Sequence, residues 1–292
     1  MIIALFGNSI PDPYLGYLQQ LVDNLSQAGD QLMLYEPFAV SLKGRIRFAL
    51  PPMVFNNPEE IVGKTGLFLS IGGDGTILEA VTIVRDSGIP IAGINMGHLG
   101  FLSSISKEEI LPAITEIREK KYLLDRRTLL KIESPKELFP SCNFALNEVT
   151  VYKGHTPNLL SIKTYIDGEF LNGYWADGLI VATPTGSTAY SLSCTGPILT
   201  PDAENFVITP IASHNLTVRP IVVRDTCRIS IVIDSKEKDF FVSLDSRMER
   251  ITEPLEIDVV KAPFQVGLVR LSGLSFYKTI REKLKWGLDI RN

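Results

Sequence analysis

The segment between residues 66 and 94 places the strongest constraint on the fold of this chain. Residues 66–71 are apolar and run straight into the sequence Gly72-Gly-Asp-Gly-Thr76. Apolar residues then recur at helical spacing, and residues 89–94 form a second apolar run. A continuous apolar run is typical of a strand covered on both faces, and the order strand, turn, helix, strand favours a parallel sheet. The segment therefore predicts a β-α-β unit with a glycine-rich turn before its helix.

The same alternation extends over the first third of the chain. Residues 2–6 and 31–35 read as buried strands, and the sequence between them has the apolar spacing of a helix that ends near Gly29. We therefore expect an α/β N-terminal domain, with a doubly wound, mostly parallel sheet, over residues 1–123. From residue 124 onward, short runs rich in β-branched residues alternate with turn signals, which predicts a β-rich C-terminal domain.

The composition limits the possible classes of function. The 292 residues include 29 Lys and Arg against 33 Asp and Glu, and the net charge of −4 disfavours a general nucleic-acid binder or a polybasic membrane protein. The three cysteines and three histidines are dispersed, so neither a disulfide framework nor a structural zinc site is expected. No apolar run approaches the roughly 18 residues of a membrane span. We expect a reduced, cytoplasmic protein that binds neither nucleic acid nor membranes.

The turn at residues 72–76 is the first candidate for chemistry. Glycines let backbone N–H groups approach a phosphate closely, and a helix N-terminus adds a partial positive charge. Asp74 is electrostatically awkward among phosphates unless it accepts a hydroxyl proton or holds a metal ion that bridges them. The alternative is a plain Asp-Gly turn in which Asp74 only caps the helix. The strand-turn-helix context favours the phosphate site, and the chain has neither a P-loop nor a GxGxxG fingerprint.

Two further polar features lie in the β-rich part. The apolar strand at residues 179–182 leads into a loop crowded with hydroxyl groups, in which Tyr190 offers a flat apolar face to a polar ligand. The alternative for this loop is a Ser/Thr-rich hairpin corner. Asn147 and Glu148 interrupt an apolar strand, and such a pair can clamp a ribose diol because a carboxylate accepts from two hydroxyls. The alternative here is an exposed polar pair on a half-buried strand.

Taken in order, these segments resemble the NAD kinase family over nearly the whole chain. The ordered set is residues 72–76, Asn95-Met-Gly-His-Leu-Gly-Phe101, Asn147-Glu148, residues 177–193, residues 214–220 and the tail at residues 281–286. The resemblance implies a kinase that transfers the γ-phosphoryl group of ATP to the 2′-hydroxyl of the adenosine ribose of NAD, which produces NADP. It also implies a homodimer or homotetramer, a site between the domains, and a C-terminal tail that returns to the first domain. The expected domains are thus residues 1–123 with 266–292, for the phosphate donor, and residues 124–265, for NAD.

The resemblance also implies a role for each matching residue. Asp74 is the expected catalytic base or hydroxyl-orienting carboxylate. Around it, Gly72, Gly73 and Gly75 are expected to surround phosphate. The remaining nucleotide-binding residues are Asn147 and Glu148 on the ribose hydroxyls, Asp177 on the nicotinamide side, Phe101 near the adenine, and Thr188, Ala189, Tyr190, Ser193 and Arg247 in the pocket. A divalent cation, magnesium, is expected to arrive with ATP rather than in a dedicated protein cage.

Three positions depart from the family pattern, and two other functions stay open. Trp175 stands where a basic residue is frequent, Cys194 where a small one is, and Arg247 follows Asp245-Ser246 where Asp-Gly-Gln is frequent. One alternative function is a diacylglycerol-type lipid kinase, and the other is a nucleotide sensor without catalysis. The hydroxyl-rich loop favours a nucleotide over a lipid, and the intact Asp74 favours catalysis over sensing. His98 and His214 are assigned to structure.

Overall fold

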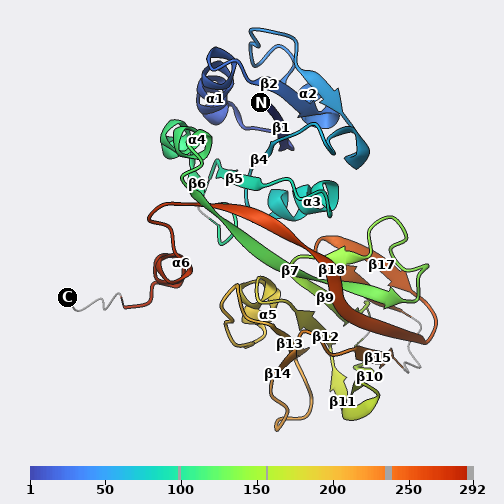
Figure 1. The fold of residues 1–292 in the computed structure, drawn as a ribbon. Helices are drawn as coiled ribbons and strands as arrows, with labels where there is room; N and C mark the ends of the chain where they lie inside the picture. Colours follow the sequence, from blue (N-terminus) through green and yellow to red (C-terminus); the bar gives the residue numbers. More distant parts are fainter. Residues whose placement is uncertain (98–99, 156, 234–238, 288–292) are drawn as a thin grey trace. The chain divides into compact units, whose positions relative to one another are not determined.

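The computed structural model describes residues 1–97, 100–155, 157–233 and 239–287, and the chain forms two compact units (Figure 1). The first unit contains Met1–Arg126 and Val266–Asn292, and the second contains Arg127–Gln265. Two long strands, β7 (Tyr122–Ser134) and β18 (Leu255–Leu271), continue from one unit into the other. Because the chain crosses the boundary twice, its C-terminal segment belongs to the same unit as its N-terminal segment.

A parallel sheet forms the centre of the first unit. Its strands are β1 (Ile2–Gly7), β2 (Gln31–Tyr35), β3 (Met53–Phe55), β4 (Leu67–Ile71) and β5 (Ile91–Asn95), in the order β5-β4-β1-β2-β3. All neighbouring pairs in this order run parallel. The short β6 (Ile105–Ser106) and the end of β18 also pair with β5 in parallel. The prediction of a doubly wound, mostly parallel sheet is therefore confirmed.

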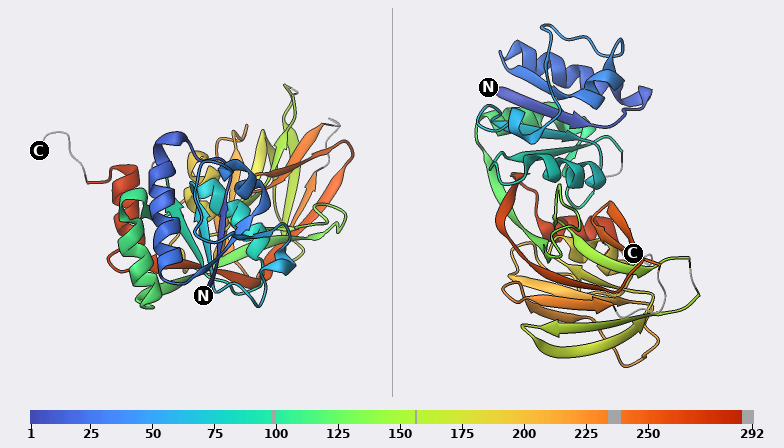
Figure 2. Two further views of the ribbon diagram at one scale, coloured as in Figure 1. Left: turned by 90° about the horizontal axis from the view of Figure 1, so that it is seen from above. Right: turned by 90° about the vertical axis from the view of Figure 1, so that its right-hand side faces the viewer.

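Helices cover this sheet (Figure 2). They are α1 (Leu15–Gln27), α2 (Glu36–Leu42), α3 (Asp74–Val84) and α4 (Ile110–Arg118). Short 3-10 helices lie at Asp12–Tyr14, Pro58–Glu60 and Lys107–Glu109, and α6 (Phe276–Leu284) follows β18 in the same unit. α1 buries its apolar stripe in the core and packs against α4, where Arg118 donates to the Asn24 side chain at 3.2 Å. Gly29, at a left-handed φ of 76°, follows the end of α1 and turns the chain into β2.

The strand order indicates where this sheet binds a ligand. β1 pairs with both β2 and β4, because the chain runs outward from β1 to β2 and β3 and then returns to the other side of β1. In open α/β sheets, ligands bind beyond the carboxyl ends of the strands at such a reversal. The residues that lie there are Asn8, directly after β1, and residues 72–76, directly after β4.

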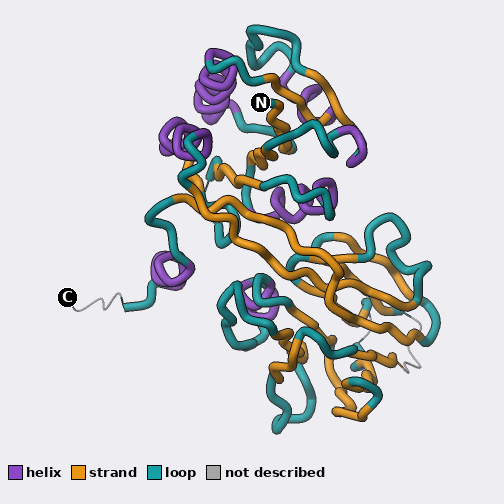
Figure 3. The backbone as a smooth tube through the Cα atoms, viewed as in Figure 1, coloured by secondary structure: helices purple, strands orange, loops and turns teal. Residues whose placement is uncertain are grey.

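The second unit is built mainly from strands (Figure 3), and these strands pair antiparallel. One sheet has the order β14-β13-β12-β9-β16-β17, with β9 (Glu148–Lys153) and β12 (Gly178–Ala182) at its centre. Its outer strands are β13 (Asn205–Ile211), β14 (Ile221–Arg224), β16 (Phe240–Leu244) and β17 (Arg247–Ile251). The other strands are β10 (Leu160–Ile166), β11 (Glu169–Ala176), β15 (Ile229–Ile233) and the first part of β18, while β8 (Phe144–Ala145) pairs with β7.

The two sets of strands in the second unit share one hydrophobic core. Val149 and Val181 from the six-stranded sheet belong to the same buried cluster as Ile162 and Ile231 from the other set. The alternation predicted around residue 231 holds, because Ile229, Ile231 and Ile233 are all buried. Within the described part of this unit, helix is limited to the 3-10 turn Gly186–Thr188 and to α5 (Tyr190–Ser193). The prediction of a β-rich C-terminal region is confirmed.

Candidate functional site

The turn after β4 leaves its backbone open. Gly72 has no room for a side chain, because a Cβ there would lie 2.1 Å from Thr76 Oγ1. Its N–H donates to the Ile94 carbonyl at 2.9 Å. Gly73 and Gly75 have open space where a Cβ would stand. α3 begins at Asp74, and the first N–H groups of a helix have no partner within the helix. The turn thus has the geometry of a phosphate cradle at the reversal of the strand order.

Asp74 does not cap its own helix but holds a separate loop. Its Oδ2 accepts from the Phe101 N–H at 2.7 Å, and its Oδ1 accepts from Leu102 and Ser103 at 3.0 and 2.9 Å. The Ser103 hydroxyl also donates to the Gly72 carbonyl at 3.1 Å. A carboxylate has about four acceptor positions, so these three bonds leave one position on Oδ2. Asp74 therefore ties the 101–103 loop to the turn and still has one lone pair for a ligand hydroxyl.

The motif around Phe101 is described in part. Asn95 is buried at the end of β5, and its Oδ1 accepts from the Gly97 N–H at 2.7 Å, which shapes the turn after the strand. Residues 98 and 99 lie outside the described part of the chain, so the structural role predicted for His98 falls outside the described residues. Phe101 contacts Asp74 through its backbone, and the position of its ring near an adenine stays a prediction.

In the second unit, Asn147 and Glu148 lie at the start of β9 and are buried. The two residues are only 8% and 9% exposed to solvent. They are therefore not the exposed polar pair that the sequence left open as an alternative. The Asn147 carbonyl accepts from the Thr183 N–H at 2.8 Å, which links this segment to the loop after β12. Within the described residues, Glu148 Oε2 is a buried oxygen without a hydrogen-bond partner. A buried carboxyl with an unused oxygen is suited to hydroxyl recognition.

The surroundings of Glu148 keep it neutral at physiological pH. Burial raises the pKa of Glu148, and the nearby Asp245 carboxylate raises it further, to about 8. The protonated carboxyl is the uncharged form, and it is the form that burial in low dielectric favours. Strongly shifted carboxyls of this kind are enriched at functional sites, which adds to the case for this position.

The loop after β12 brings several of the predicted residues to Glu148. Loss of water around the Tyr190 hydroxyl raises its pKa, and nearby acidic groups raise it further; these groups are Cys194, Asp177, Tyr152 and Glu148. Asp177 itself is paired with Lys153 at 2.7 Å. Tyr190 remains 45% exposed, so its ring is available to a ligand. Glu148, Asp177 and Tyr190 thus share one neighbourhood within the second unit.

Most hydroxyls of this loop shape the loop instead of pointing at a ligand. Thr183 donates to the Leu146 carbonyl at 2.5 Å and accepts from the Gly186 N–H at 3.1 Å. Ser187 donates to the Pro184 carbonyl at 2.6 Å, and Thr188 donates to the Thr185 carbonyl at 3.1 Å. The crowding of Ser and Thr is explained largely by these internal bonds, while the exposed Ser193 and Tyr190 are left to meet a ligand.

Gly186 lies close against the backbone of Asn147. A Cβ on Gly186 would lie 2.1 Å from the Asn147 carbonyl oxygen, which is a backbone atom that cannot rotate away. We expect Gly186→Ala to lower the free energy of unfolding by about 3 kcal/mol, as overpacking against a fixed backbone does. Gly173→Ala is the matched control, because open space surrounds its added Cβ. Chemical denaturation of both variants measures the difference, and equal stability would show that the loop moves freely.

Arg247 is engaged by the backbone next to the Asn147 segment. Its guanidinium donates to the carbonyls of Cys142 and Phe144. These bonds use donors that the sequence assigned to the nucleotide, and Arg247 as a nucleotide-binding residue stays a prediction. Sequence reasoning gave no role to two residues that the structure brings forward. Asn8 lies after β1 and donates to Glu79 of α3 at 3.2 Å, and Asp245 accepts hydrogen bonds from the backbone at Asn147.

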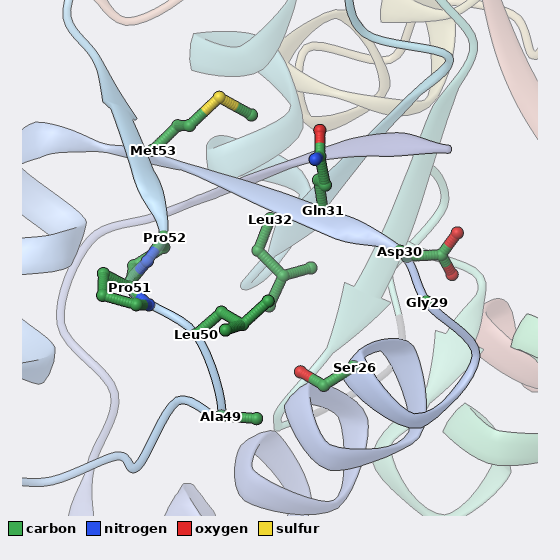
Figure 4. Close-up of a pocket in the computed structure, with 10 residues that line it drawn as sticks. All are labelled: Ser26, Gly29, Asp30, Gln31, Leu32, Ala49, Leu50, Pro51, Pro52 and Met53. Atoms are coloured by element: carbon green, nitrogen blue, oxygen red, sulfur yellow. The ribbon is translucent and has the colours of Figure 1, made fainter.

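A pocket of about 290 Å³ in the first unit lies at the amino ends of the parallel strands β2 and β3 (Figure 4). It is lined by Asp30 and Gln31 at the start of β2 and by Leu50, Pro51 and Met53 around the start of β3. These are the amino ends of parallel strands, so the pocket is separate from the turn at residues 72–76. The Asp30 carboxylate is already paired with the Met1 ammonium at 3.1 Å and with Arg118 at 2.6 Å.

Two kinds of site are missing among the described residues. No group of three or more His, Cys, Asp or Glu side chains in them is placed to hold a metal ion. No helix in that part of the chain is long and apolar enough to cross a membrane.

Comparison with known proteins gives consistent matches over the chain. The ATP-NAD kinase N-terminal domain matches residues 58–122, and the ATP-NAD kinase C-terminal domain matches residues 146–271. The NAD kinase of Cytophaga hutchinsonii is 46% identical over 294 residues, which cover 100% of both chains. Yeast NADH kinase, solved in complex with NADH, superposes with a TM-score of 0.88 at 26% identity and covers 100% of this chain and 89% of its own. An NAD kinase from Archaeoglobus fulgidus in complex with ATP has the same fold, with a TM-score of 0.75 at 23% identity over 98% and 99% of the two chains.

Proposed function

Since this chain belongs to the NAD kinase family, we propose that it transfers the γ-phosphoryl group of ATP to the 2′-hydroxyl of the adenosine ribose of NAD and releases NADP and ADP. The observation that carries the proposal is the intact Asp74, which keeps one acceptor position on Oδ2 at the open glycine turn. In this reaction the ribose oxygen forms a bond to the γ-phosphorus, the bond from that phosphorus to the β,γ-bridging oxygen breaks, and the hydroxyl proton passes to Asp74.

The first unit supplies the site for the phosphate donor in this proposal. Gly72, Gly73 and Gly75 surround the phosphates, with the N–H groups of Gly73 and Gly75 as donors, because the Gly72 N–H is used by the Ile94 carbonyl. The N-terminus of α3 adds its partial positive charge. Magnesium enters as part of the substrate, bound to ATP, where it bridges phosphate oxygens and neutralises their charge.

The second unit supplies the contacts to NAD in this proposal. Asn147 and Glu148 bind the ribose hydroxyls, and Glu148 Oε2 has no hydrogen-bond partner among the described residues. Asp177 contacts the nicotinamide side of the nucleotide. Tyr190 packs its exposed ring on the nucleotide, in a pocket completed by Thr188, Ala189 and Ser193. The shared neighbourhood of Glu148, Asp177 and Tyr190 supports this grouping.

The proposed function is tested by direct product detection. The purified protein is incubated with ATP, magnesium and NAD, and NADP is measured with a dehydrogenase specific for NADP. Parallel reactions replace NAD with diacylglycerol vesicles or omit magnesium. NADP formation that needs magnesium supports the proposal. Phosphorylated lipid without NADP, or NAD binding without turnover, would refute it in favour of a lipid kinase or a nucleotide sensor.

The loop held by Asp74 provides a more local test. We expect Gly100→Ala to lower kcat by about ten- to a hundredfold, because its Cβ would lie 1.8 Å from Asp74 Oδ1 and would displace the carboxylate. Gly97→Ala in the same loop is the control, since the nearest atom to its added Cβ is Asn95 Oδ1 at 3.9 Å. Steady-state kinetics of NADP formation compares the two. Equal kcat values would contradict the role given to the position of Asp74.

The assembly and compartment of the protein are also proposals. We propose a homodimer or homotetramer, as the family resemblance implies, and a location in the cytoplasm, as the composition suggests. Light scattering after size-exclusion chromatography measures the assembly, and a monomer at micromolar concentration would contradict it.

A further inference from the structure

The hairpin turn between β16 and β17 contacts the segment that carries Glu148. Asp245 is the first residue of this turn and has a left-handed φ of 51°. Its Oδ2 accepts from the Leu146 N–H at 2.9 Å, and its Oδ1 accepts from Asn147 and Glu148 at 2.8 and 3.2 Å. The Asp245 N–H in turn donates to the Glu148 carbonyl at 3.1 Å. Four hydrogen bonds therefore fix the backbone of residues 146–148 to one aspartate.

The same turn also holds the segment from its other side. Arg247, two residues after Asp245, donates to the carbonyls of Cys142 and Phe144. Burial raises the pKa of Asp245, and the three backbone N–H bonds and the positive charge of Arg247 offset part of this shift. Residues 142–148 are thus hydrogen-bonded by an acidic and a basic side chain of one hairpin. These bonds fix the backbone conformation of the segment that precedes β9.

We propose that Asp245 is a positioning residue for NAD binding: it fixes the Asn147-Glu148 backbone and places its carboxylate next to the Glu148 carboxyl. This inference rests on the proposed function, because it assigns the ribose hydroxyls to Glu148. Asp245 does not touch the substrate itself. It acts through the backbone of residues 146–148, and through the negative charge of its carboxylate beside the Glu148 carboxyl.

The charge relation makes this role different from simple structural support. The groups that face Glu148 are Asp245 from the hairpin turn, and Tyr190 and Cys194 from the loop after β12. Asp245 raises the pKa of Glu148, so its removal as a charge lets Glu148 ionise at lower pH. The pH dependence of kcat/KM for NAD reports ionisations in the free enzyme, so it reports this change.

Asp245→Asn tests the inference with its geometry largely kept, since asparagine tolerates a left-handed φ. At saturating ATP, we expect a KM for NAD about tenfold higher, because an amide nitrogen replaces one acceptor for the backbone N–H groups. We also expect the midpoint of the kcat/KM profile for NAD to move about one pH unit lower, while the KM for ATP is unchanged. The control is Asp258→Asn, whose carboxylate pairs with Arg228 and Ser230 in the same unit.

Two additional variants make the test decisive. In Glu148→Gln, the further change Asp245→Asn should raise KM but leave the pH profile where it is, because the responding group is gone. If Asp245→Asn does not fold, Asp245→Glu keeps the charge and displaces the carboxylate by one methylene, and we expect a higher KM for NAD without a shifted midpoint. An unchanged KM and midpoint in Asp245→Asn, or an unchanged KM in Asp245→Glu, overturns the inference. A wild-type protein that forms no NADP refutes the proposed function instead.

Discussion

Asp74→Asn abolishes NADP formation, with kcat expected to fall by about a thousandfold, the usual size of a lost general base. The asparagine Oδ1 can still accept from Leu102 and Ser103, so the turn and the 101–103 loop keep most of their bonds. What is lost is an oxygen that can take a proton from the ribose hydroxyl, because an amide nitrogen now stands at the position of Oδ2. The effect on catalysis is therefore much larger than the effect on structure.

The measurement has to separate turnover from binding and from folding. We expect the dissociation constant for NAD, measured by calorimetry, to change by less than about threefold, since the ribose contacts assigned to Glu148 are untouched. Asp23→Asn on α1 is the control, because the hydrogen bond that its carboxylate accepts among the described residues comes from the Gln19 side chain on the same helix. A folded Asp74→Asn variant with near-normal kcat would mean that Asp74 serves only to hold the 101–103 loop.

Glu148→Gln changes how the stability of the protein depends on pH. Burial and then the charge of Asp245 raise the pKa of Glu148 from 4.5 to about 8 in the folded protein. The unfolded chain therefore releases this proton at lower pH than the folded chain does. The stabilisation from the neutral carboxyl is complete below pH 4.5, and it is lost as the pH rises through 8.

The expected slope follows from the size of the shift. Between those two pH values, this one group lowers the free energy of unfolding by about 1.4 kcal/mol for each pH unit. Glutamine does not titrate, so Glu148→Gln flattens that part of the curve, whereas Glu253→Gln at an exposed turn does not. Urea denaturation at several pH values measures the curve. Identical slopes for wild type and Glu148→Gln would show that the buried carboxyl is not held neutral.

The elements whose pattern lies within one short stretch of the chain could be predicted from the sequence. The turn at residues 72–76 is one of them, because an apolar strand, a glycine that has no room for a Cβ and a helix follow one another directly. The short elements were beyond the pattern. α2 has seven residues with a proline near its start and β3 has three, and neither is long enough to show a period.

The partners of the candidate site residues could not be predicted, because they come from far along the chain. The N–H groups on Asp74 lie 27 to 29 residues away, and the carboxylate beside Glu148 lies 97 residues away. The sequence also names hydroxyl groups without giving their direction. The hydroxyl-rich loop therefore suggested ligand contacts, whereas the hydrogen bonds of Thr183 and Ser187 close the loop on itself.

The triple hydrogen bond on Asp74 has a consequence for the catalytic cycle. A carboxyl group that has gained a proton is uncharged, and hydrogen bonds to a neutral acceptor are weaker than those to a carboxylate. If Asp74 takes the ribose proton, the same event weakens its bonds to Phe101, Leu102 and Ser103. These three hydrogen bonds then weaken once in each turnover, and they regain their strength only when Asp74 releases its proton to water. Recovery of the enzyme after each reaction would thus include the re-forming of a loop, at a rate set by one deprotonation.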